Sequence, residues 1–285
     1  PLTYEIRIPS AQIKSAIMLS ALNTNGTVKI KEFKTTRDHT ENMLKSMGYN
    51  IKVKENSLYR FIEMKNNQDL KTINYNVPGD PSSAAFFSAL TLLKKNSILK
   101  IKDVGLNKTR TGFYQILKKQ GAKIEFKNLK NKSKELRGDI IVKSCKLKPI
   151  YAPKEYYVNT TDEYPILFIM AALIKGISIF KGISDLANKE SNRIVEMQNI
   201  LNQINVKSSF SKDEFKIYGV GMIDASNKKI IVPNLSDHRI CMSAFVLAIL
   251  TGANTKIKNF ETVFTSSPSF LKIMKTLGSK FEIQK

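Results

Sequence analysis

Cysteine and histidine are both scarce in this sequence of 285 residues. The two cysteines, Cys145 and Cys241, are too few for a disulfide framework or a cysteine-rich zinc site. The two histidines, His39 and His238, argue against histidine-ligated metal chemistry. We therefore expect no metal site and a location in a reducing compartment, the cytoplasm.

Long hydrophobic runs are also absent. The longest runs, Ala84–Leu93, Ile166–Ile174 and Met242–Leu250, each have about ten residues, whereas a membrane-spanning helix needs roughly 20. We expect these runs to form helices buried in a protein core, without membrane association. The first residues, Pro1–Glu5, lack the pattern of a signal peptide, and because the chain does not begin with methionine we expect a fragment or a processed product.

Acidic residues are in short supply. The chain has 46 Lys and Arg residues but only 24 Asp and Glu residues, which gives a net charge of +22. Such a charge can indicate nucleic-acid binding. The basic residues, however, are mostly lysines spread along the whole chain, and no motif of basic and aromatic residues stands out. The composition favours a lysine-rich surface whose field attracts small anionic substrates, with a nucleic-acid-binding protein as the alternative.

One sequence unit occurs four times, which predicts an α/β fold of repeats. Each copy has an apolar helix, a strand, an amphipathic helix and a closing strand. The copies begin at residues 10, 82, 163 and 238, so they are 72, 81 and 75 residues apart. The first helix of each copy is apolar on all faces and is expected to be buried, with the sheets outside. Glycines at 48, 121 and 278 are expected to end three of the second helices.

The length of the chain indicates about two domains. The strongest turn cluster between two copies is Asn76–Pro81, with the sequence NVPGDP. It is the predicted domain boundary.

Each predicted buried helix begins with a polar cluster, and such clusters can cap the helix or bind an anion at its positive end. Gln12 and Arg239 are not preferred capping residues, which favours anion binding there. The clusters are Pro9-Ser10-Ala11-Gln12, Gly79-Asp80-Pro81-Ser82-Ser83, Thr161-Asp162-Glu163-Tyr164-Pro165 and Asp237-His238-Arg239.

Two charged clusters occupy matching positions before second helices. Arg37-Asp38-His39-Thr40-Glu41 lies in the first copy and Lys189-Glu190-Ser191-Asn192-Arg193 in the third. Glu190 and Arg193 are three residues apart, so they can share a face. Either cluster could be a surface ion-pair group. No Ser-His-Asp grouping, Cys-His grouping or phosphate-binding glycine loop is evident.

These clusters resemble the motifs of the EPSP synthase (3-phosphoshikimate 1-carboxyvinyltransferase) family. The matches occur in the order of the family and span essentially the whole chain. They are Pro9–Ser15, the run PGDPSSAAFF at Pro78–Phe87, Asp162–Pro165, Lys189–Ser191 with Arg193, and Asp237–Ile240 with Met242.

The resemblance implies the enolpyruvyl transferase fold, an inside-out α/β barrel of six βαβαββ repeats in two domains. Four repeats lie in this chain, and the first two are expected outside it. Residues 1–78 would then be the last part of the shikimate-binding domain, and residues 79–285 a second domain of three repeats. By itself this fragment is expected to be inactive.

The resemblance also implies a reaction and its residues. The 5-hydroxyl of shikimate 3-phosphate attacks the enol carbon of phosphoenolpyruvate, and phosphate leaves, without a cofactor. Asp162 would be the base and Glu190 a candidate for proton transfer at the methylene. Shikimate 3-phosphate would be bound by Ser10, Ala11, Gln12, Arg37, Asp162 and Lys189. Phosphoenolpyruvate would be bound by Gln12, Arg193 and Arg239.

The sequence departs from the family pattern at two places. Leu186–Arg193 reads LANKESNR, where the family usually has LRVKESDR, and Thr265–Pro268 reads TSSP. Three short patterns are similar to those of the glyphosate-tolerant subclass. They are Ser10-Ala11-Gln12 with Lys14, Arg37 with His39 and Glu41, and Asn107 with Thr109-Arg110.

Two other interpretations stay open besides nucleic-acid binding. One is the related enolpyruvyl transferase that acts on UDP-N-acetylglucosamine, although the PGDPSSAAFF run favours the shikimate enzyme. The other is an inactive fragment. The expected partners are the two small anionic substrates, with no nucleic acid and no membrane, and the expected state is a monomer.

Overall fold

The structure is a computed structural model that describes residues 2–65 and 69–283. The chain divides into two compact units. Unit 1 comprises Pro1–Pro81, Ile101–Gly112 and Phe126–Ile140, and unit 2 comprises Ser82–Lys100, Phe113–Glu125 and Ile141–Lys285. The described residues contain no helix that is both long and apolar enough to cross a membrane.

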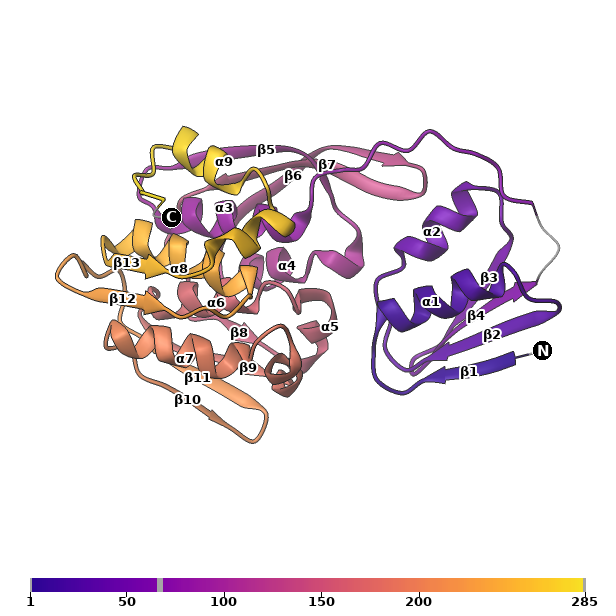
Figure 1. The fold of residues 1–285 in the computed structure, drawn as a ribbon, viewed down its shortest axis with the longest axis horizontal. Coiled ribbons are helices and arrows are strands. Elements are labelled where there is room, and N and C mark those ends of the chain that lie inside the picture. The colour runs from indigo at the N-terminus through magenta and orange to yellow at the C-terminus, as the bar shows by residue number, and fades with distance from the viewer. Residues whose placement is uncertain (1, 66–68, 284–285) are drawn as a thin grey trace. The chain divides into compact units, whose positions relative to one another are not determined.

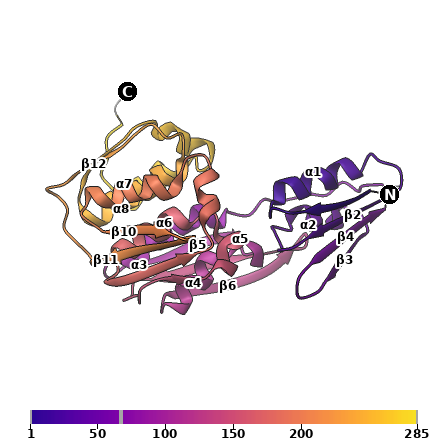
Figure 2. The same cartoon turned by 90° about the horizontal axis from the view of Figure 1, so that it is seen from below.

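Unit 1 contains a four-stranded sheet in the order β1-β2-β4-β3. β1 runs parallel to β2, whereas β4 is antiparallel to both β2 and β3. Two helices cover one face of this sheet (Figures 1 and 2). The elements are β1 (Leu2–Ile6), α1 (Ala11–Ala21), β2 (Thr27–Glu32), α2 (His39–Ser46), β3 (Ile51–Glu55) and β4 (Arg60–Lys65).

The core of unit 1 follows from alternation along the strands. Val28 and Ile30 of β2 and Ile62 and Met64 of β4 are buried, and their neighbours point away from the core. Met18 of α1 packs against the same cluster. Because strand residues two apart share a face, this pattern gives the sheet one buried side.

A second sheet has the order β5-β7-β6, and its strands have residues in both units. Gly79 forms a parallel bridge with Val104 of β5. The elements of this part are α3 (Pro81–Leu93), β5 (Ile98–Gly105), the short 3-10 helix η1 (Lys108–Arg110), α4 (Gly112–Lys119), β6 (Lys123–Lys132) and β7 (Glu135–Lys143).

Unit 2 continues with the sheet β8-β9-β11-β10 and the parallel pair β12-β13. The strands are β8 (Tyr151–Ala152), β9 (Gly176–Lys181), β10 (Ser208–Ser211), β11 (Glu214–Gly219), β12 (Lys229–Val232) and β13 (Asn254–Ile257). The helices are η2 (Lys154–Tyr156), α5 (Tyr157–Thr160), α6 (Tyr164–Ala172), η3 (Ser184–Asn188), α7 (Arg193–Gln203), α8 (His238–Thr251), η4 (Phe260–Thr265) and α9 (Phe270–Thr276).

One strand order recurs along the chain. The sheet β8-β9-β11-β10 repeats the pattern of β1-β2-β4-β3, with a parallel first pair followed by antiparallel pairs. The predicted glycines at 48, 121 and 278 all have positive φ, at 89°, 93° and 90°. They follow α2, α4 and α9, where a left-handed residue ends a helix.

The interior of unit 2 is built on apolar helices. Every residue of α6 is buried, and this helix packs against α7 and α8. This burial agrees with a helix that is apolar on all faces. Cys241 of α8 is a buried free thiol, and burial raises its pKa to about 12.

Two expectations are wrong. α1 is not buried on all faces: Ile13 and Leu19 are 42% and 53% exposed, because the described residues cover only the side that carries Lys14, Met18 and Ala21. Residues 279–283, expected to form the last closing strand, have no strand assignment. Instead, the ring centroids of Phe281 and Phe245 are 5.5 Å apart, so this segment is held by a side-chain contact and not by strand pairing.

Candidate active site

Arg193 is the centre of a charged cluster in unit 2. It is the first residue of α7, which Asn192 caps by accepting a hydrogen bond from the Val195 amide. The Arg193 residue is fully buried, and its Nε donates to Asp237 Oδ2 at 2.9 Å. Its Nη2 donates to Glu190 Oε2 at 2.5 Å. Glu190 and Arg193 therefore do form the predicted pair.

Asp237 joins the starts of α7 and α8. Its carboxylate caps α8 by accepting from the Arg239 amide at 3.0 Å, and it also accepts from the Ser191 hydroxyl at 3.0 Å. Burial alone would raise the pKa of Asp237, but the Arg193 guanidinium and these hydrogen bonds hold it below its usual range. Asp237 is thus ionised at neutral pH and is the buried counter-ion of Arg193.

Asp162 lies between two guanidinium groups. Its Oδ2 is 3.2 Å from Arg239 Nη2, and its Oδ1 is 3.9 Å from Arg193 Nη1. Arg193 Nη1 is buried and has no hydrogen-bond acceptor among the described residues. The cluster therefore offers arginine donors in the fork geometry that suits carboxylate and phosphate groups.

The carboxylates differ in how open they are to an incoming ligand. The Asp237 side chain is fully buried, that of Asp162 is 18% exposed and that of Glu190 is 47% exposed. An anion entering the cluster can displace the more exposed carboxylates from the guanidinium groups and leave Asp237 in place.

Lys189 lies beside this cluster but has a partner of its own. Its Nζ is 2.6 Å from Asp185 Oδ2, which also accepts from the Tyr157 hydroxyl at 2.7 Å. Burial acts to raise the pKa of Asp185, but the bonds from Lys189 and Tyr157 hold it below its usual range. Asp185 thus fixes the lysine ammonium by an ion pair.

His238 is the first residue of α8, directly before Arg239. Its Nε2 is buried and has no hydrogen-bond partner among the described residues. Burial and the nearby Arg239 lower its pKa, so the ring is neutral at pH 7.

The predicted site residues at the other end of the chain lie in unit 1. Ser10 caps α1 by accepting from the Ile13 amide at 3.2 Å, and Ala11 and Gln12 form the first turn of that helix. Gln12 is exposed, and Arg37 is half-buried just before α2. The structure thus brings Asp162, Glu190, Arg193 and Arg239 together in unit 2, and it places Ser10, Ala11, Gln12 and Arg37 in unit 1.

The sequence patterns similar to the tolerant subclass are joined by hydrogen bonds within unit 1. His39 Nδ1 lies 2.8 Å from Glu135 Oε1. The Asn107 amide donates to Glu135 Oε2 at 3.0 Å and to Asp38 Oδ1 at 2.7 Å. A cavity of about 400 Å³ lies beside this group, and its lining includes Met43. Burial acts to raise the pKa of Glu135, but these bonds hold it below its usual range.

Comparison with known proteins decides the family. A sequence profile described as EPSP synthase (3-phosphoshikimate 1-carboxyvinyltransferase) matches residues 1–274. The chain belongs to the EPSP synthase family. The chain is 38% identical over 285 residues to the 3-phosphoshikimate 1-carboxyvinyltransferase of Zymomonas mobilis, a match that covers 99% of this chain and 63% of the relative. The Acidiphilium cryptum protein of the same name is 36% identical over 282 residues, with 99% and 62% covered.

Solved structures agree with this family. The EPSP synthase of Acinetobacter baumannii superposes with a TM-score of 0.88 at 33% identity, over 100% of this chain and 64% of that chain. The enolpyruvyl transferase NikO of Streptomyces tendae superposes with a TM-score of 0.71 at 13% identity, which shows likeness of fold alone. The predicted mixed α/β enolpyruvyl transferase fold is therefore confirmed. The chain spans less than two thirds of the length of the relatives and structures it matches.

Several residues in and beside the charged cluster of this EPSP synthase family member were not predicted from the sequence. Asp237 was expected as part of a polar cluster that starts a helix, but its bond to Arg193 was not predicted. Asp185 and Tyr157 were not singled out, although Asp185 lies four residues before Lys189, a spacing that brings side chains together on a helical segment. For Tyr157 no signal in the sequence indicated the contact.

Proposed function

We propose that the protein transfers the enolpyruvyl group of phosphoenolpyruvate to the 5-hydroxyl of shikimate 3-phosphate and releases phosphate. The observation that carries this proposal is the pair of arginines, Arg193 and Arg239, placed around the Asp162 carboxylate. Two guanidinium groups suit a ligand with a carboxylate and a phosphate. A carboxylate between them can accept a proton from a hydroxyl.

In the proposed reaction, the substrate oxygen bonds to the enol carbon of phosphoenolpyruvate and its proton passes to Asp162. The methylene carbon receives a proton, for which Glu190 is the candidate donor, and becomes a methyl group. A proton then leaves that methyl group as the carbon–oxygen bond to phosphate breaks, and the double bond forms again. Asp162 and Glu190 both contact Arg193, so the two proton-transfer groups are adjacent.

The other roles are proposals on the same basis. Lys189, Asp162, Ser10, Ala11, Gln12 and Arg37 bind shikimate 3-phosphate, and Gln12, Arg193 and Arg239 bind phosphoenolpyruvate. Residues 1–78 are proposed as the last part of the shikimate-binding domain and 79–285 as a second domain of three repeats. A cytoplasmic monomer that needs no cofactor fits this function.

Phosphate release by the full-length gene product tests the proposal. We expect release that requires both phosphoenolpyruvate and shikimate 3-phosphate, and none when UDP-N-acetylglucosamine replaces the shikimate ester. Release with the nucleotide sugar instead would assign the related enolpyruvyl transferase activity. A duplex-binding titration at several salt concentrations covers the nucleic-acid alternative, which tight, steeply salt-dependent binding would favour.

We further propose that the protein belongs to the glyphosate-tolerant subclass. Glyphosate resembles phosphoenolpyruvate in charge, so Arg193 and Arg239 should attract both. Tolerance must then arise from a steric difference that the smaller substrate escapes. We expect a bulkier residue in the glycine-rich loop of the family, which these 285 residues do not contain. A glyphosate inhibition constant well below the Michaelis constant for phosphoenolpyruvate would contradict this.

A further inference from the structure

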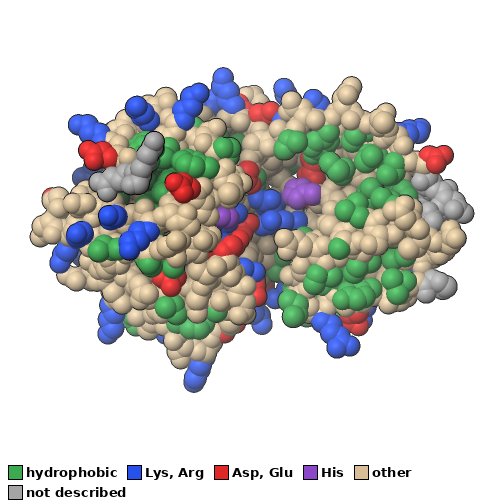
Figure 3. Space-filling view, viewed as in Figure 1, with side chains coloured by type: hydrophobic (Ala, Val, Ile, Leu, Met, Phe, Trp, Pro, Cys, Tyr) green, Lys and Arg blue, Asp and Glu red, His purple; other side chains and the backbone are tan. Residues whose placement is uncertain are grey.

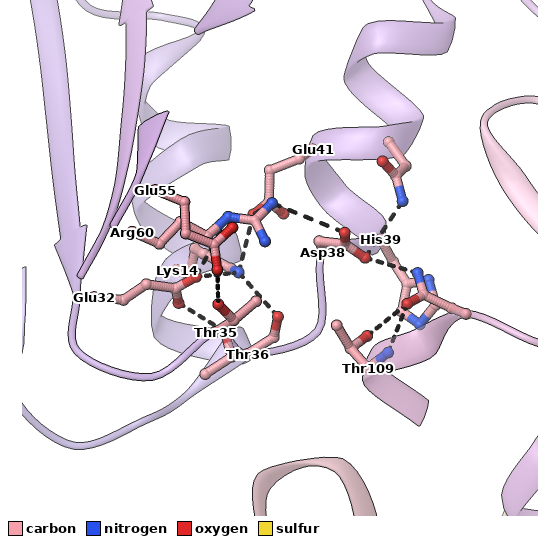
Figure 4. A network of polar contacts seen from close by, with 12 residues as sticks. Lys14, Glu32, Thr35, Thr36, Asp38, His39, Glu41, Glu55, Arg60 and Thr109 are labelled. Atoms are coloured by element: carbon pink, nitrogen blue, oxygen red, sulfur yellow. Dashed lines mark hydrogen bonds and ion pairs between the residues drawn. The ribbon is translucent and has the colours of Figure 1, made fainter. Parts of the chain in front are cut away.

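Lys14 is a charged side chain with no exposed surface, in the first turn of α1 and two residues after Gln12. Its Nζ lies 2.9 Å from Glu41 Oε1 and 3.1 Å from Glu32 Oε1 (Figure 4). It also donates to the Thr36 carbonyl at 3.5 Å. A buried ammonium is costly unless it is paired, so these contacts decide where the lysine can lie.

The two acidic partners of Lys14 come from two other elements of unit 1, and Arg60 pairs with the same two acids. Glu32 ends β2, and Glu41 lies in the first turn of α2. Arg60 begins β4, and its Nε lies 3.9 Å from Glu32 Oε1. Its Nη2 lies 3.8 Å from both Glu41 Oε1 and Asp38 Oδ2. The Lys14 side chain is fully buried and those of Glu32 and Glu41 are each 1% exposed, so these three charged groups are almost completely withdrawn from water.

The loop between β2 and α2 is held to the same group at one residue. Thr36 accepts from Lys14 through its carbonyl and donates through its hydroxyl to Glu32 Oε2 at 2.9 Å. The next residue is Arg37, one of the proposed ligands of shikimate 3-phosphate. Lys14 therefore joins two segments of unit 1. One is the first turn of α1, which carries Gln12, and the other is the loop that carries Arg37.

Stability alone is a weak reason for such a group. Replacing a buried ion-pair cluster by apolar side chains is often neutral or stabilising, because desolvation offsets the attraction between the charges. Directional hydrogen bonds and ion pairs, in contrast, fix the distance between the segments they join. The contacts of Lys14 with β2, α2 and the loop fix the distance between the first turn of α1 and the loop before α2. Both of these segments carry proposed ligands of shikimate 3-phosphate.

We propose that Lys14 is a positioning residue for the anionic substrate. Its ammonium holds the first turn of α1, with Ser10, Ala11 and Gln12, at a set distance from Arg37. The two segments thereby match the spacing of the polar groups on shikimate 3-phosphate. This inference rests on the proposed function, since it takes shikimate 3-phosphate as the ligand.

The test uses Lys14→Met in the full-length gene product, because methionine keeps the length of the side chain and removes its charge. Binding of shikimate 3-phosphate is measured by calorimetry, and the Michaelis constant for phosphoenolpyruvate and the melting temperature are measured in parallel. We expect the dissociation constant for shikimate 3-phosphate to rise about tenfold or more, because small displacements of binding groups weaken a site strongly. The Michaelis constant for phosphoenolpyruvate should rise less, because Gln12 is the one proposed ligand of that substrate on the displaced helix turn, whereas Arg193 and Arg239 lie on α7 and α8.

Two further variants make the test specific. Lys29→Met is the matched control, because Lys29 lies on β2 and its pair with Glu63, at 3.8 Å, is exposed. It should leave binding unchanged. Glu41→Gln weakens the same buried group more mildly, and it carries the test if Lys14→Met does not fold. We expect it to weaken shikimate 3-phosphate binding in the same direction.

The outcomes separate the two proposals. The inference is overturned if Lys14→Met binds shikimate 3-phosphate normally, even if its melting temperature is lower, because Lys14 would then have only a structural role. If Lys14→Met does not fold, normal binding by Glu41→Gln overturns the inference in the same way. Equal losses of affinity for both substrates would also overturn it. If the unmodified protein does not bind shikimate 3-phosphate, the proposed function fails and this inference fails with it.

Discussion

At the scale of single residues, the partners of Arg193 divide the site into a fixed part and an exchangeable part. Asp237 is buried, ionised and bonded to both Arg193 and the start of α8. Asp162 and Glu190 contact the same guanidinium but are open to solvent on one side. In the proposed function, a substrate therefore competes with Asp162 and Glu190 for the arginine while Asp237 keeps the arginine in place.

The proposed base is tested by Asp162→Asn in the full-length gene product. The amide keeps the shape of the side chain but cannot accept the hydroxyl proton, so turnover should fall by about 10²- to 10⁴-fold. Binding of shikimate 3-phosphate should weaken less, because the proposed Lys189 and Arg37 contacts remain. Steady-state phosphate release and a binding titration give the two values. Turnover close to that of the unmodified protein would show that the base lies elsewhere.

Asp237→Asn tests the counter-ion role through the pH dependence of stability. The pKa of Asp237 in the folded protein lies below its ordinary value of 3.8, so its ionised form stabilises the fold. This stabilisation is present above the unfolded pKa and is lost as the pH falls through the folded pKa. At neutral pH the variant should unfold with a free energy about 3 kcal/mol smaller, since it leaves a buried arginine less well paired.

The difference between Asp237→Asn and the unmodified protein should be steady from about pH 7 to about 5 and shrink as the pH falls further toward about 3, because Asp237 then takes up a proton first in the unfolded chain. Urea unfolding over this range measures it. Asparagine is also a good helix cap, so loss of the cap does not explain the effect. Asp224→Asn, at an exposed aspartate, is the control and should change much less. A difference that stays constant with pH would contradict the ion pair.

At the scale of elements, the close approach of β11 to the end of α6 depends on one glycine. A Cβ atom at Gly219 would lie 2.0 Å from the Ile174 carbonyl oxygen and 2.2 Å from that of Ala171. Both contacts are with backbone, so relief requires a shift of the strand or of the chain after the helix. The sheet can therefore lie on the fully buried α6 only with glycine at this position.

Gly219→Ala should accordingly lower the free energy of unfolding by about 1–3 kcal/mol or more, as overpacking does in other cores. Urea denaturation at neutral pH measures the change. Gly79→Ala is the comparison variant, because its Cβ would meet no atom closer than 3.5 Å. Equal stability of the two variants would mean that α6 and β11 are not packed as described.

The sequence predicts well those elements that depend on local pattern. Apolar runs predicted the buried α6 and α8, and glycines predicted the ends of α2, α4 and α9. The exposed face of α1 was not predicted, because an apolar sequence does not say which residues cover it. Polar and apolar residues alternate along residues 279–283, as they do in a strand. Alternation alone does not form a strand, because a neighbouring strand must also be available for pairing.

The candidate site was predictable only in part, and for the same reason. Motifs indicated Asp162, Glu190, Arg193 and Arg239, and the structure places these four side chains in one charged cluster. The bond between Arg193 and Asp237 joins residues 44 positions apart, and that between Lys14 and Glu32 joins residues 18 apart. No local spacing rule covers such pairs, because they depend on how the helices and strands pack.

At the scale of the whole molecule, the net charge of +22 is carried by a dispersed lysine surface. On the face shown in Figure 3, Lys and Arg side chains are spread over both units, while hydrophobic side chains gather over α1 and α2. A dispersed positive charge raises the local concentration of anions without a defined contact. In the proposed function, selection of a particular anion falls to the arginine cluster of α7 and α8.

The reaction in deuterium oxide tests the proposed enolpyruvyl transfer by addition and elimination. The full-length gene product is incubated with phosphoenolpyruvate and shikimate 3-phosphate, and the product is examined by proton NMR. We expect a carboxyvinyl ether at the 5-hydroxyl that carries deuterium in its methylene group, because the methylene carbon gains and then loses a proton. Free phosphate without this ether, or an ether without deuterium, would contradict the addition–elimination mechanism.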